Sequence, residues 1–196
     1  MQNPGRPREF DPDEILSKIM QLFWEGGYEA TGLSDIIAAT GLGKASLYAT
    51  FGNKQSMYLK ALSQYEALAV DAAVSLLRDT AQTPQARIGT FISLPVVALR
   101  DHQDRRGCFL CNASADRGSL DAQTATLVQR GYEKLRLAIV QALREMQPDQ
   151  STAQIEGEAA LVLAVYSGLR VMARSGMPVA VLMASRDEVL RAVGVV

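Results

Sequence analysis

The chain has 196 residues, of which 48% are hydrophobic, and a formal net charge of −1. This length and apolar content suffice for a buried core in one or two domains, which excludes a disordered polypeptide. A near-zero net charge excludes a protein that coats nucleic acid through overall positive charge. The polar N-terminus MQNPGRPREF lacks the apolar segment of a signal peptide, and runs such as AALVLAVY at 159–166 are too short to cross a bilayer. We therefore expect a cytoplasmic protein with no membrane partner.

The first predicted helix begins after Asp11, which can cap it, and Pro12 suits the first helical position. Its apolar side chains, among them Ile15, Ile19 and Phe23, recur at helical spacing. They are expected to hold a small N-terminal domain together.

Residues 31–54, TGLSDIIAATGLGKASLYATFGNK, are built like a helix-turn-helix. Thr31 or Ser34 can cap a short helix whose apolar residues have helical spacing. Gly41 can adopt the left-handed conformation that ends this helix. The segment is thus a candidate for reading DNA.

The second helix of this motif is expected from about Lys44 to Phe51. Leu47 and Phe51 lie four residues apart and share one face, which would be buried. The remaining surface is available to DNA and carries Lys44, Ala45, Ser46, Tyr48, Ala49 and Thr50.

The stretch from Asp11 to Leu62 resembles the DNA-binding domain of the tetracycline-repressor (TetR) family, whereas the rest of the chain resembles it only in length and helical character. The match is dense and ordered, which makes it more specific than a lone helix-turn-helix. The matching residues are Gly27-Tyr28, Thr31, Asp35-Ile36, Gly41-Leu42-Gly43-Lys44, Ser46-Leu47-Tyr48, Phe51 and Asn53-Lys54.

The resemblance implies a homodimer that binds a double-stranded DNA operator, with a small-molecule effector and no cofactor. It also implies which residues meet DNA. Side chains at Lys44, Ser46, Tyr48 and Lys54 would touch phosphates or base edges. Gly43, Ala45 and Ala49 would bring the helix backbone close to the groove.

Charge and side-chain size indicate which residues of this surface contact phosphates and which contact bases. No acidic residue lies between Gly41 and Lys60, so Lys44 and Lys54 are candidates for phosphate contacts. The N-terminal arm adds Arg6 and Arg8, which can bind phosphates or a minor groove. Base reading falls to the short side chains of Ser46, Ala49 and Thr50. For single residues a purely structural role stays open: Tyr48 as a core aromatic, Lys54 as a solvated lysine, and Thr31 as a cap.

The remaining helical patterns predict an all-α protein of about nine helices with no strand. We expect a DNA-binding domain at 1–56 and an effector-binding and dimerisation domain at 57–196. A long helix is expected from Asn53 towards Leu77.

The last two predicted helices are the candidate dimer surface, because small residues keep one of them slim while larger apolar residues supply area. The alternative is a stripe buried within one subunit. The candidate interface residues are Ala160, Ala164, Gly168, Leu169, Met172 and Leu182.

An effector pocket in the larger domain follows from the family resemblance. Any residue assigned to it can equally be an ordinary core residue. A ligand would act by binding better to the dimer state whose two DNA-binding domains are wrongly spaced for the operator. The candidate lining residues are Tyr65, Phe91, Leu94, His102, Phe109, Tyr132 and Tyr166.

Cys108 and Cys111 suggest another signal. Cys108 follows Arg105 and Arg106 at a predicted helix start, where nearby cations and the helix dipole favour a reactive thiolate. This resembles members of the same family that sense oxidants or electrophiles through a cysteine at the start of the corresponding helix. The alternative is that both cysteines are small core residues.

An enzyme is the competing class, with Cys108 as nucleophile and His102 as base, but no third orienting group is evident. We therefore expect no enzymatic activity. One histidine and two cysteines do not complete a zinc site, so no metal is expected either. A DNA-binding architectural protein without a ligand is the third class. Repression is favoured over activation, because a dimer bound at a promoter blocks polymerase without a further contact surface.

Overall fold

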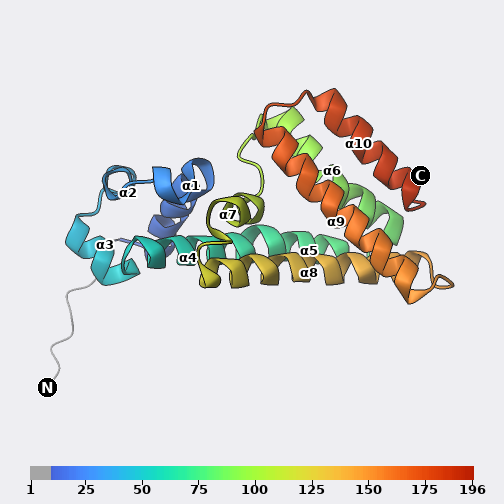
Figure 1. Cartoon of the computed structure of the whole chain (residues 1–196), viewed down its shortest axis with the longest axis horizontal. Coiled ribbons are helices and arrows are strands. Elements are labelled where there is room, and N and C mark those ends of the chain that lie inside the picture. The colour runs from blue at the N-terminus through green and yellow to red at the C-terminus, as the bar shows by residue number, and fades with distance from the viewer. Residues whose placement is uncertain (1–9) are drawn as a thin grey trace, which may run out of the picture. The chain divides into compact units, whose positions relative to one another are not determined.

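A computed structural model describes residues 10–196 and shows, within that range, ten α-helices, one π-helical segment and no strand. The π-helical segment joins two α-helices without a break, so that counting this run as one helix gives nine. The all-α prediction is confirmed. The chain divides into two compact units, Met1–Gln64 and Tyr65–Val196 (Figure 1).

The smaller unit begins with a capped helix, as predicted. The Asp11 side chain accepts a hydrogen bond from the Asp13 backbone N–H (2.9 Å). The first helix is interrupted at Gly27, whose φ of 79° is accessible to glycine at little cost. The helices of this unit are α1 (Pro12–Ala30), α2 (Leu33–Thr40), α3 (Lys44–Phe51) and α4 (Lys54–Tyr65).

The boundary between the units falls later than the expected position after residue 56. The reason is that α4 supplies core residues to the smaller unit. Tyr58 is 1% exposed, and its ring centroid lies 5.1 Å from those of Phe23 and Tyr28, edge-on to both. Met57 is likewise fully buried. Most of α4 therefore belongs with the helices that precede it.

The larger unit is a helical bundle in which α8 packs against α5, α7 and α9, and α9 also packs against α6 and α10 (Figure 1). Its core is formed by apolar side chains of these helices, such as Phe91, Ile139 and Leu169. Its elements are η1 (Glu66–Val70), α5 (Asp71–Leu77), α6 (Pro84–His102), α7 (Phe109–Arg117), α8 (Ala122–Met146), α9 (Thr152–Arg174) and α10 (Val179–Ala192).

The long helix expected from Asn53 to Leu77 contains the π-helical turn η1, which the sequence did not predict. Glu66 opens this turn and is 3% exposed. It accepts hydrogen bonds from Arg130 Nε (2.9 Å) and pairs with Lys134 (3.0 Å), which also reaches Asp71 (2.7 Å). Burial by itself raises the pKa of Glu66, but the hydrogen bonds from Arg130 and Lys134 outweigh it and lower the pKa below its ordinary value.

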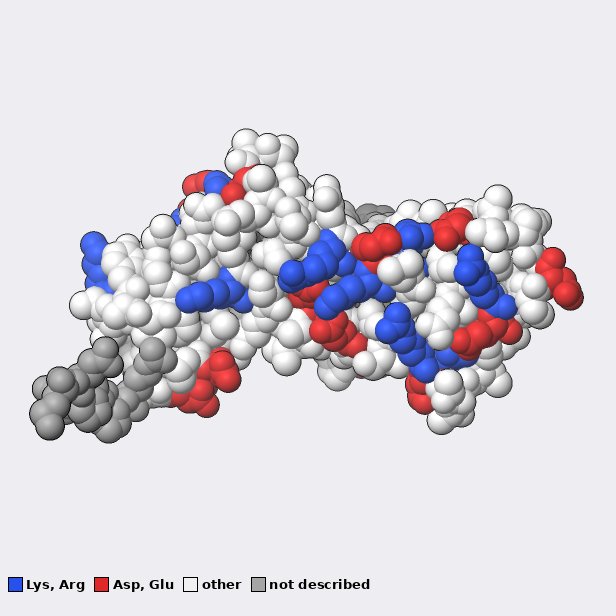
Figure 2. Space-filling view, turned by 90° about the horizontal axis from the view of Figure 1, so that it is seen from below, with Lys and Arg blue, Asp and Glu red and all other residues white. Residues whose placement is uncertain are grey.

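Charged side chains of both signs adjoin one another over the larger unit on the face drawn in Figure 2. Several ion pairs join charged side chains of this unit, among them Arg136 with Glu133 (2.7 Å). Positive charge on that face is therefore largely compensated locally. Within residues 10–196, no helix combines the length and apolarity that crossing a membrane requires.

The buried Glu66 pair gives a stability prediction. The substitution E66Q should lower the free energy of unfolding near pH 7 by about 1–3 kcal/mol, because Arg130 and Lys134 lose the buried charge that they bind. Folding lowers the pKa of Glu66, so its stabilisation is complete above the unfolded-state pKa and is lost as the pH falls through the folded-state pKa. In urea unfolding, the difference between E66Q and the wild type should shrink as the pH falls below about 4.

The matched control is E133Q, which removes an exposed carboxylate from α8, the helix that carries Arg130 and Lys134, and should change stability little. Equal effects of E66Q and E133Q at pH 7 would show that the buried cluster does not stabilise η1 against α8.

Candidate nucleic-acid interface and internal cavity

A tight turn sets the direction of α3 relative to α2. Gly41 ends α2 with a φ of 72°, and its N–H donates to the Ile37 carbonyl (2.9 Å). The Thr40 hydroxyl donates to the Ile36 carbonyl (2.7 Å) and accepts from the Leu42 N–H (3.3 Å). These bonds satisfy backbone groups at the end of α2. The turn expected at Gly41 is confirmed, whereas the contribution of Thr40 was not predicted.

The helix α3 buries one side and exposes the other. Leu47 is fully buried and Phe51 is 4% exposed, as their spacing predicted. Tyr48 is 41% exposed, which argues against its being a core aromatic. Thr50 is half-buried, and Gly43 is the N-cap residue. We call the exposed side the recognition face: Lys44, Ala45, Ser46, Tyr48 and Ala49.

Three lysines in this unit lie against aromatic rings. The Lys44 Nζ is 5.6 Å from the centroid of the Tyr48 ring, and the Lys54 Nζ is 4.5 Å from that of Tyr28. The Lys60 Nζ lies 5.7 Å from the centroid of the Phe51 ring and also donates to the carbonyls of Thr50 (3.3 Å) and Phe51 (3.2 Å). A cation at the C-terminal end of a helix is favourable for its dipole. Lys60 therefore stabilises the end of α3, a role that the sequence did not reveal.

The Thr31 side chain is held by a hydrogen bond within the smaller unit. It is 4% exposed, and its hydroxyl donates to the Gly27 carbonyl (2.7 Å) where α1 is interrupted. The N-cap of α2 is Gly32, whose N–H donates to the Asp35 carboxylate (2.7 Å). The cap prediction for Thr31 and Ser34 was wrong because Asp35 satisfies the N-terminal backbone instead. The arm residues Arg6 and Arg8 lie outside the described residues.

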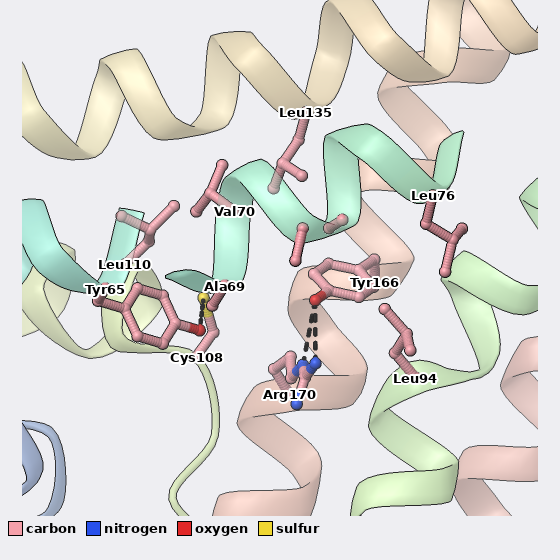
Figure 3. A pocket seen from close by; sticks show the side chains of 12 residues that line it. Tyr65, Ala69, Val70, Leu76, Leu94, Cys108, Leu110, Leu135, Tyr166 and Arg170 are labelled. Atoms are coloured by element: carbon pink, nitrogen blue, oxygen red, sulfur yellow. Dashed lines mark hydrogen bonds between the residues drawn. The ribbon is translucent and has the colours of Figure 1, made fainter. Parts of the chain in front are cut away.

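The larger unit contains a cavity of about 160 Å³ that is mostly apolar. Two polar pairs interrupt its wall (Figure 3): the Tyr65 hydroxyl donates to the Cys108 Sγ (3.6 Å), and Arg170 donates to the Tyr166 hydroxyl (3.0 Å from Nη2). The complete lining is Tyr65, Ala69, Val70, Ala72, Ala73, Leu76, Leu94, Cys108, Leu110, Leu135, Tyr166 and Arg170.

Three of the predicted pocket residues line this cavity: Tyr65, Leu94 and Tyr166. Phe91 and Phe109 are core residues that support them. Phe91 stacks on Tyr166 with 4.3 Å between ring centroids, and Phe109 meets Tyr65 edge-on at 5.7 Å. Neither Phe91 nor Phe109 is part of the cavity lining.

His102 and Tyr132 also lie outside the cavity lining. His102 is exposed at the end of α6, and Tyr132 is a neighbour of the Cys111 Sγ (3.1 Å). Arg170, in contrast, lines the cavity and was missed. Its position one helical turn after Tyr166 was the available signal.

The two cysteines interact with each other at the start of α7. Cys108 is the N-cap residue and is 4% exposed. The hydrogen bond from the Cys111 side chain lowers the pKa of the Cys108 thiol, with smaller contributions from the Tyr65 hydroxyl and the charge of Arg170, although burial opposes the shift. The same bond raises the pKa of Cys111.

The expected cations are not the ones that act on Cys108. Arg106 pairs with Asp104 (2.7 Å), and Arg105 is exposed. Gly107 instead brings Cys108 close to α9: its φ is 76°, and a Cβ there would lie 3.1 Å from the Arg170 carbonyl oxygen. The prediction of a lowered pKa agrees with this geometry, but its cause lies on α7 itself and on α9.

The exposed side of α9 carries small and apolar residues one turn apart. Leu161 is 42% and Val171 54% exposed. Side chains added at Gly157 or Gly168 would meet no atom within 4 Å, so another helix can approach closely there. We call this surface the α9 stripe: Gly157, Ala160, Leu161, Ala164, Gly168, Val171 and Met172.

Two predicted interface residues are not on this surface. Leu169 is 1% exposed and Leu182 is fully buried, because they face the core between α6, α9 and α10. Ala160 and Ala164 are exposed, and Gly168 and Met172 are half-buried. Among the described residues, no group of three His, Cys, Asp or Glu side chains is placed to hold a metal ion.

The known proteins to which this chain is similar are bacterial transcriptional regulators. Residues 15–61 match the model of the family described as bacterial regulatory proteins, tetR family. The HTH-type transcriptional repressor ComR of Escherichia coli (strain K12) is 29% identical over 194 residues, covering 95% of this chain and 90% of ComR. The HTH-type transcriptional regulator YezE of Bacillus subtilis (strain 168) is 30% identical over 139 residues, or 71% of each chain.

A solved structure extends the likeness to the whole fold. It is a cysteine mutant of the TetR family transcriptional regulator CifR complexed with 26-bp double-strand operator DNA. It aligns with a TM-score of 0.78 and 25% identity over 96% of this chain and 99% of that one.

The thiol geometry predicts how alkylation depends on pH. Iodoacetamide should modify Cys108 with a midpoint below the pKa of an ordinary cysteine, about 8.5, and Cys111 only at higher pH. Peptide mass mapping of the folded protein measures both rates. In the C111A variant the Cys108 midpoint should rise, because the hydrogen bond that stabilises its thiolate is gone. An inert Cys108, or an unchanged midpoint in C111A, would refute this.

Proposed function

This chain belongs to the tetR family of bacterial regulatory proteins and is a DNA-binding transcriptional regulator, and we propose that it acts as a homodimeric repressor released from a two-fold operator by a small molecule. The observation that carries this proposal is the recognition face of α3. Leu47 and Phe51 are buried on one side of this helix, so the short side chains on its other side are exposed to solvent.

The contacts proposed with DNA follow from side-chain chemistry. Lys44 and Lys54 bind phosphates and fix the position of α3 in a major groove. Ser46 and Ala49, with Thr50 beside them, reach base edges or thymine methyl groups. The recognition face carries no Arg, Asn or Gln, so few bases are read directly and DNA shape contributes to specificity.

The α9 stripe is the proposed dimer interface, together with α10, which packs beside α9. Two copies of α9 and α10 can form a four-helix bundle across a two-fold axis. The open space at Gly157 and Gly168 favours close helix approach. Such a dimer presents two recognition faces to half-sites about one helical turn, some 34–36 Å, apart.

The cavity of the larger unit is the proposed effector site. Its lining includes Ala69 and Val70 of η1, a short irregular turn of the kind that often occurs at functional sites. An effector that binds better to the dimer state with misplaced recognition faces shifts the population away from DNA. Repression is supported by relatives such as ComR, whose name describes a repressor.

Thiol modification is a second candidate signal, favoured by the position of Cys108. Its Sγ lines the cavity and receives the Tyr65 hydroxyl (3.6 Å). A group added at this sulfur would occupy the cavity as an effector does. Both signals therefore converge on one site.

We propose no enzymatic activity for this chain. His102 is exposed and Cys108 is buried, and among the described residues no hydrogen bond joins them. An architectural DNA-binding protein has no need of a cavity lined by polar side chains such as those of Arg170 and Tyr166, so the cavity supports a sensor instead.

The phosphate role of Lys44 is tested by its substitution with alanine. K44A should weaken binding to all DNA duplexes and reduce the dependence of log K on log salt concentration by roughly 2 for a dimer, about one unit per subunit. Fluorescence anisotropy over a salt series measures this slope. The control is K18A, which removes an exposed lysine that pairs with Glu14 on α1 and should leave the slope unchanged. The same slope for K44A, K18A and the wild type would rule out the proposed contact.

The dimer interface is tested by A164E. Two glutamates would face each other across the two-fold axis, so the variant should sediment as a monomer and lose affinity for an operator by about tenfold or more. L120E is the matched control, because Leu120 is 73% exposed in the turn before α8 and lies off the α9 stripe. A dimeric A164E protein would place the interface elsewhere.

A further inference from the structure

Arg170 is a partly buried cation without an acidic partner in the described part of the chain. Both of its hydrogen bonds go to one atom, the Tyr166 hydroxyl oxygen, from Nε (3.3 Å) and Nη2 (3.0 Å). Among the described residues, no Asp or Glu forms an ion pair with it. Asp104 feels its charge but pairs with Arg106 (2.7 Å). A guanidinium has five N–H donors, and Arg170 uses its Nε and Nη2 on Tyr166. Because Arg170 lines the cavity, its remaining donors and its charge are available to an anion there.

Tyr166 adds a hydrogen-bond donor at the same place. Its oxygen accepts from Arg170, so its own O–H is left to donate. Burial raises the pKa of Tyr166, which keeps this proton in place at neutral pH. Figure 3 shows the Tyr166 hydroxyl directed toward the Arg170 guanidinium. These two side chains therefore offer the cavity hydrogen-bond donors and a positive charge.

Apart from the Tyr65–Cys108 pair, the rest of the cavity is apolar and small. Its walls come from alanine and leucine side chains of α5, α6 and α8, including Ala73, Leu94 and Leu135. A dry cavity of about 150 Å³ accommodates benzene. The volume here, about 160 Å³, therefore fits one six-membered ring or a branched chain of that size.

We propose that the cavity binds a small monocarboxylate with a single flat apolar ring or a branched chain of similar size. The carboxylate accepts hydrogen bonds from Arg170 and Tyr166, and the apolar body fills the space beside Leu94 and Leu135. A neutral ligand of the same shape leaves the charge of Arg170 uncompensated. This inference rests on the proposed effector cavity and adds the chemical class of its ligand.

The thiol shares the same cation. The charge of Arg170 helps to lower the pKa of Cys108, so a bound carboxylate, which neutralises that charge, raises the thiol pKa. Ligand binding therefore slows alkylation of Cys108 at neutral pH. The two signals at this site are antagonistic.

The test uses benzoate as the probe and benzamide as its neutral counterpart, titrated into the full-length protein by calorimetry without DNA. Benzoate should bind roughly tenfold to a hundredfold more tightly than benzamide, in line with hydrogen bonds to charged groups. R170M should abolish this preference, and Y166F, which keeps the cation, should reduce it. Circular dichroism confirms that both variants are folded. Equal affinity for the two probes, or an unchanged preference in R170M, overturns the proposal.

A separate arm measures operator binding with each probe. Selective benzoate binding that leaves DNA affinity unchanged supports the anion site but contradicts its role as an effector site. Release of DNA by benzamide, without preferential binding of benzoate, leaves the effector cavity standing and refutes its anion preference.

Discussion

The burial of Leu47 and Phe51 under α3 is the constraint on which the DNA-binding account depends. These two side chains are the anchor of a short helix that is otherwise small and polar. Burial of a large apolar side chain stabilises a fold by about 1.5–3 kcal/mol, which decides which side of α3 turns inward. Gly41 then sets the direction of the helix, and Lys60 stabilises its end. Together they hold the recognition face outward as a preformed surface.

In the larger unit, a partly buried guanidinium, that of Arg170, lines a mostly apolar cavity. The Tyr166 hydroxyl accepts hydrogen bonds from Arg170. Phe91 stacks on the Tyr166 ring, with 4.3 Å between the ring centroids, and holds it in place. Cys108 is near enough for its thiol to feel the same charge. A polar group that is only partly satisfied in an apolar cavity is costly for stability alone, and ligand binding gives a reason for its presence.

The sequence predicted the smaller unit well because its signals are local. The cap at Asp11, the turn at Gly41 and the spacing of Leu47 and Phe51 all act within a few residues, and each is found in the structure. The larger unit was harder, because cavity lining depends on which side of each helix faces its neighbours. Leu169 lies one position from Gly168 on the same helix, yet only Leu169 is fully buried. The sequence shows that Arg170 is a charged residue in a mostly apolar helix. That it lacks an acidic partner and lines a cavity can be seen only in the structure, and it was therefore missed.

The central claim is that two recognition faces read a symmetric duplex. It is tested most directly by selecting bound fragments from a pool of random double-stranded DNA at physiological salt. The account predicts enrichment of two inverted half-sites whose centres lie about one helical turn, roughly 10 base pairs, apart, or a multiple of it. Failure to enrich any sequence, or enrichment of a single unpaired motif, would contradict it.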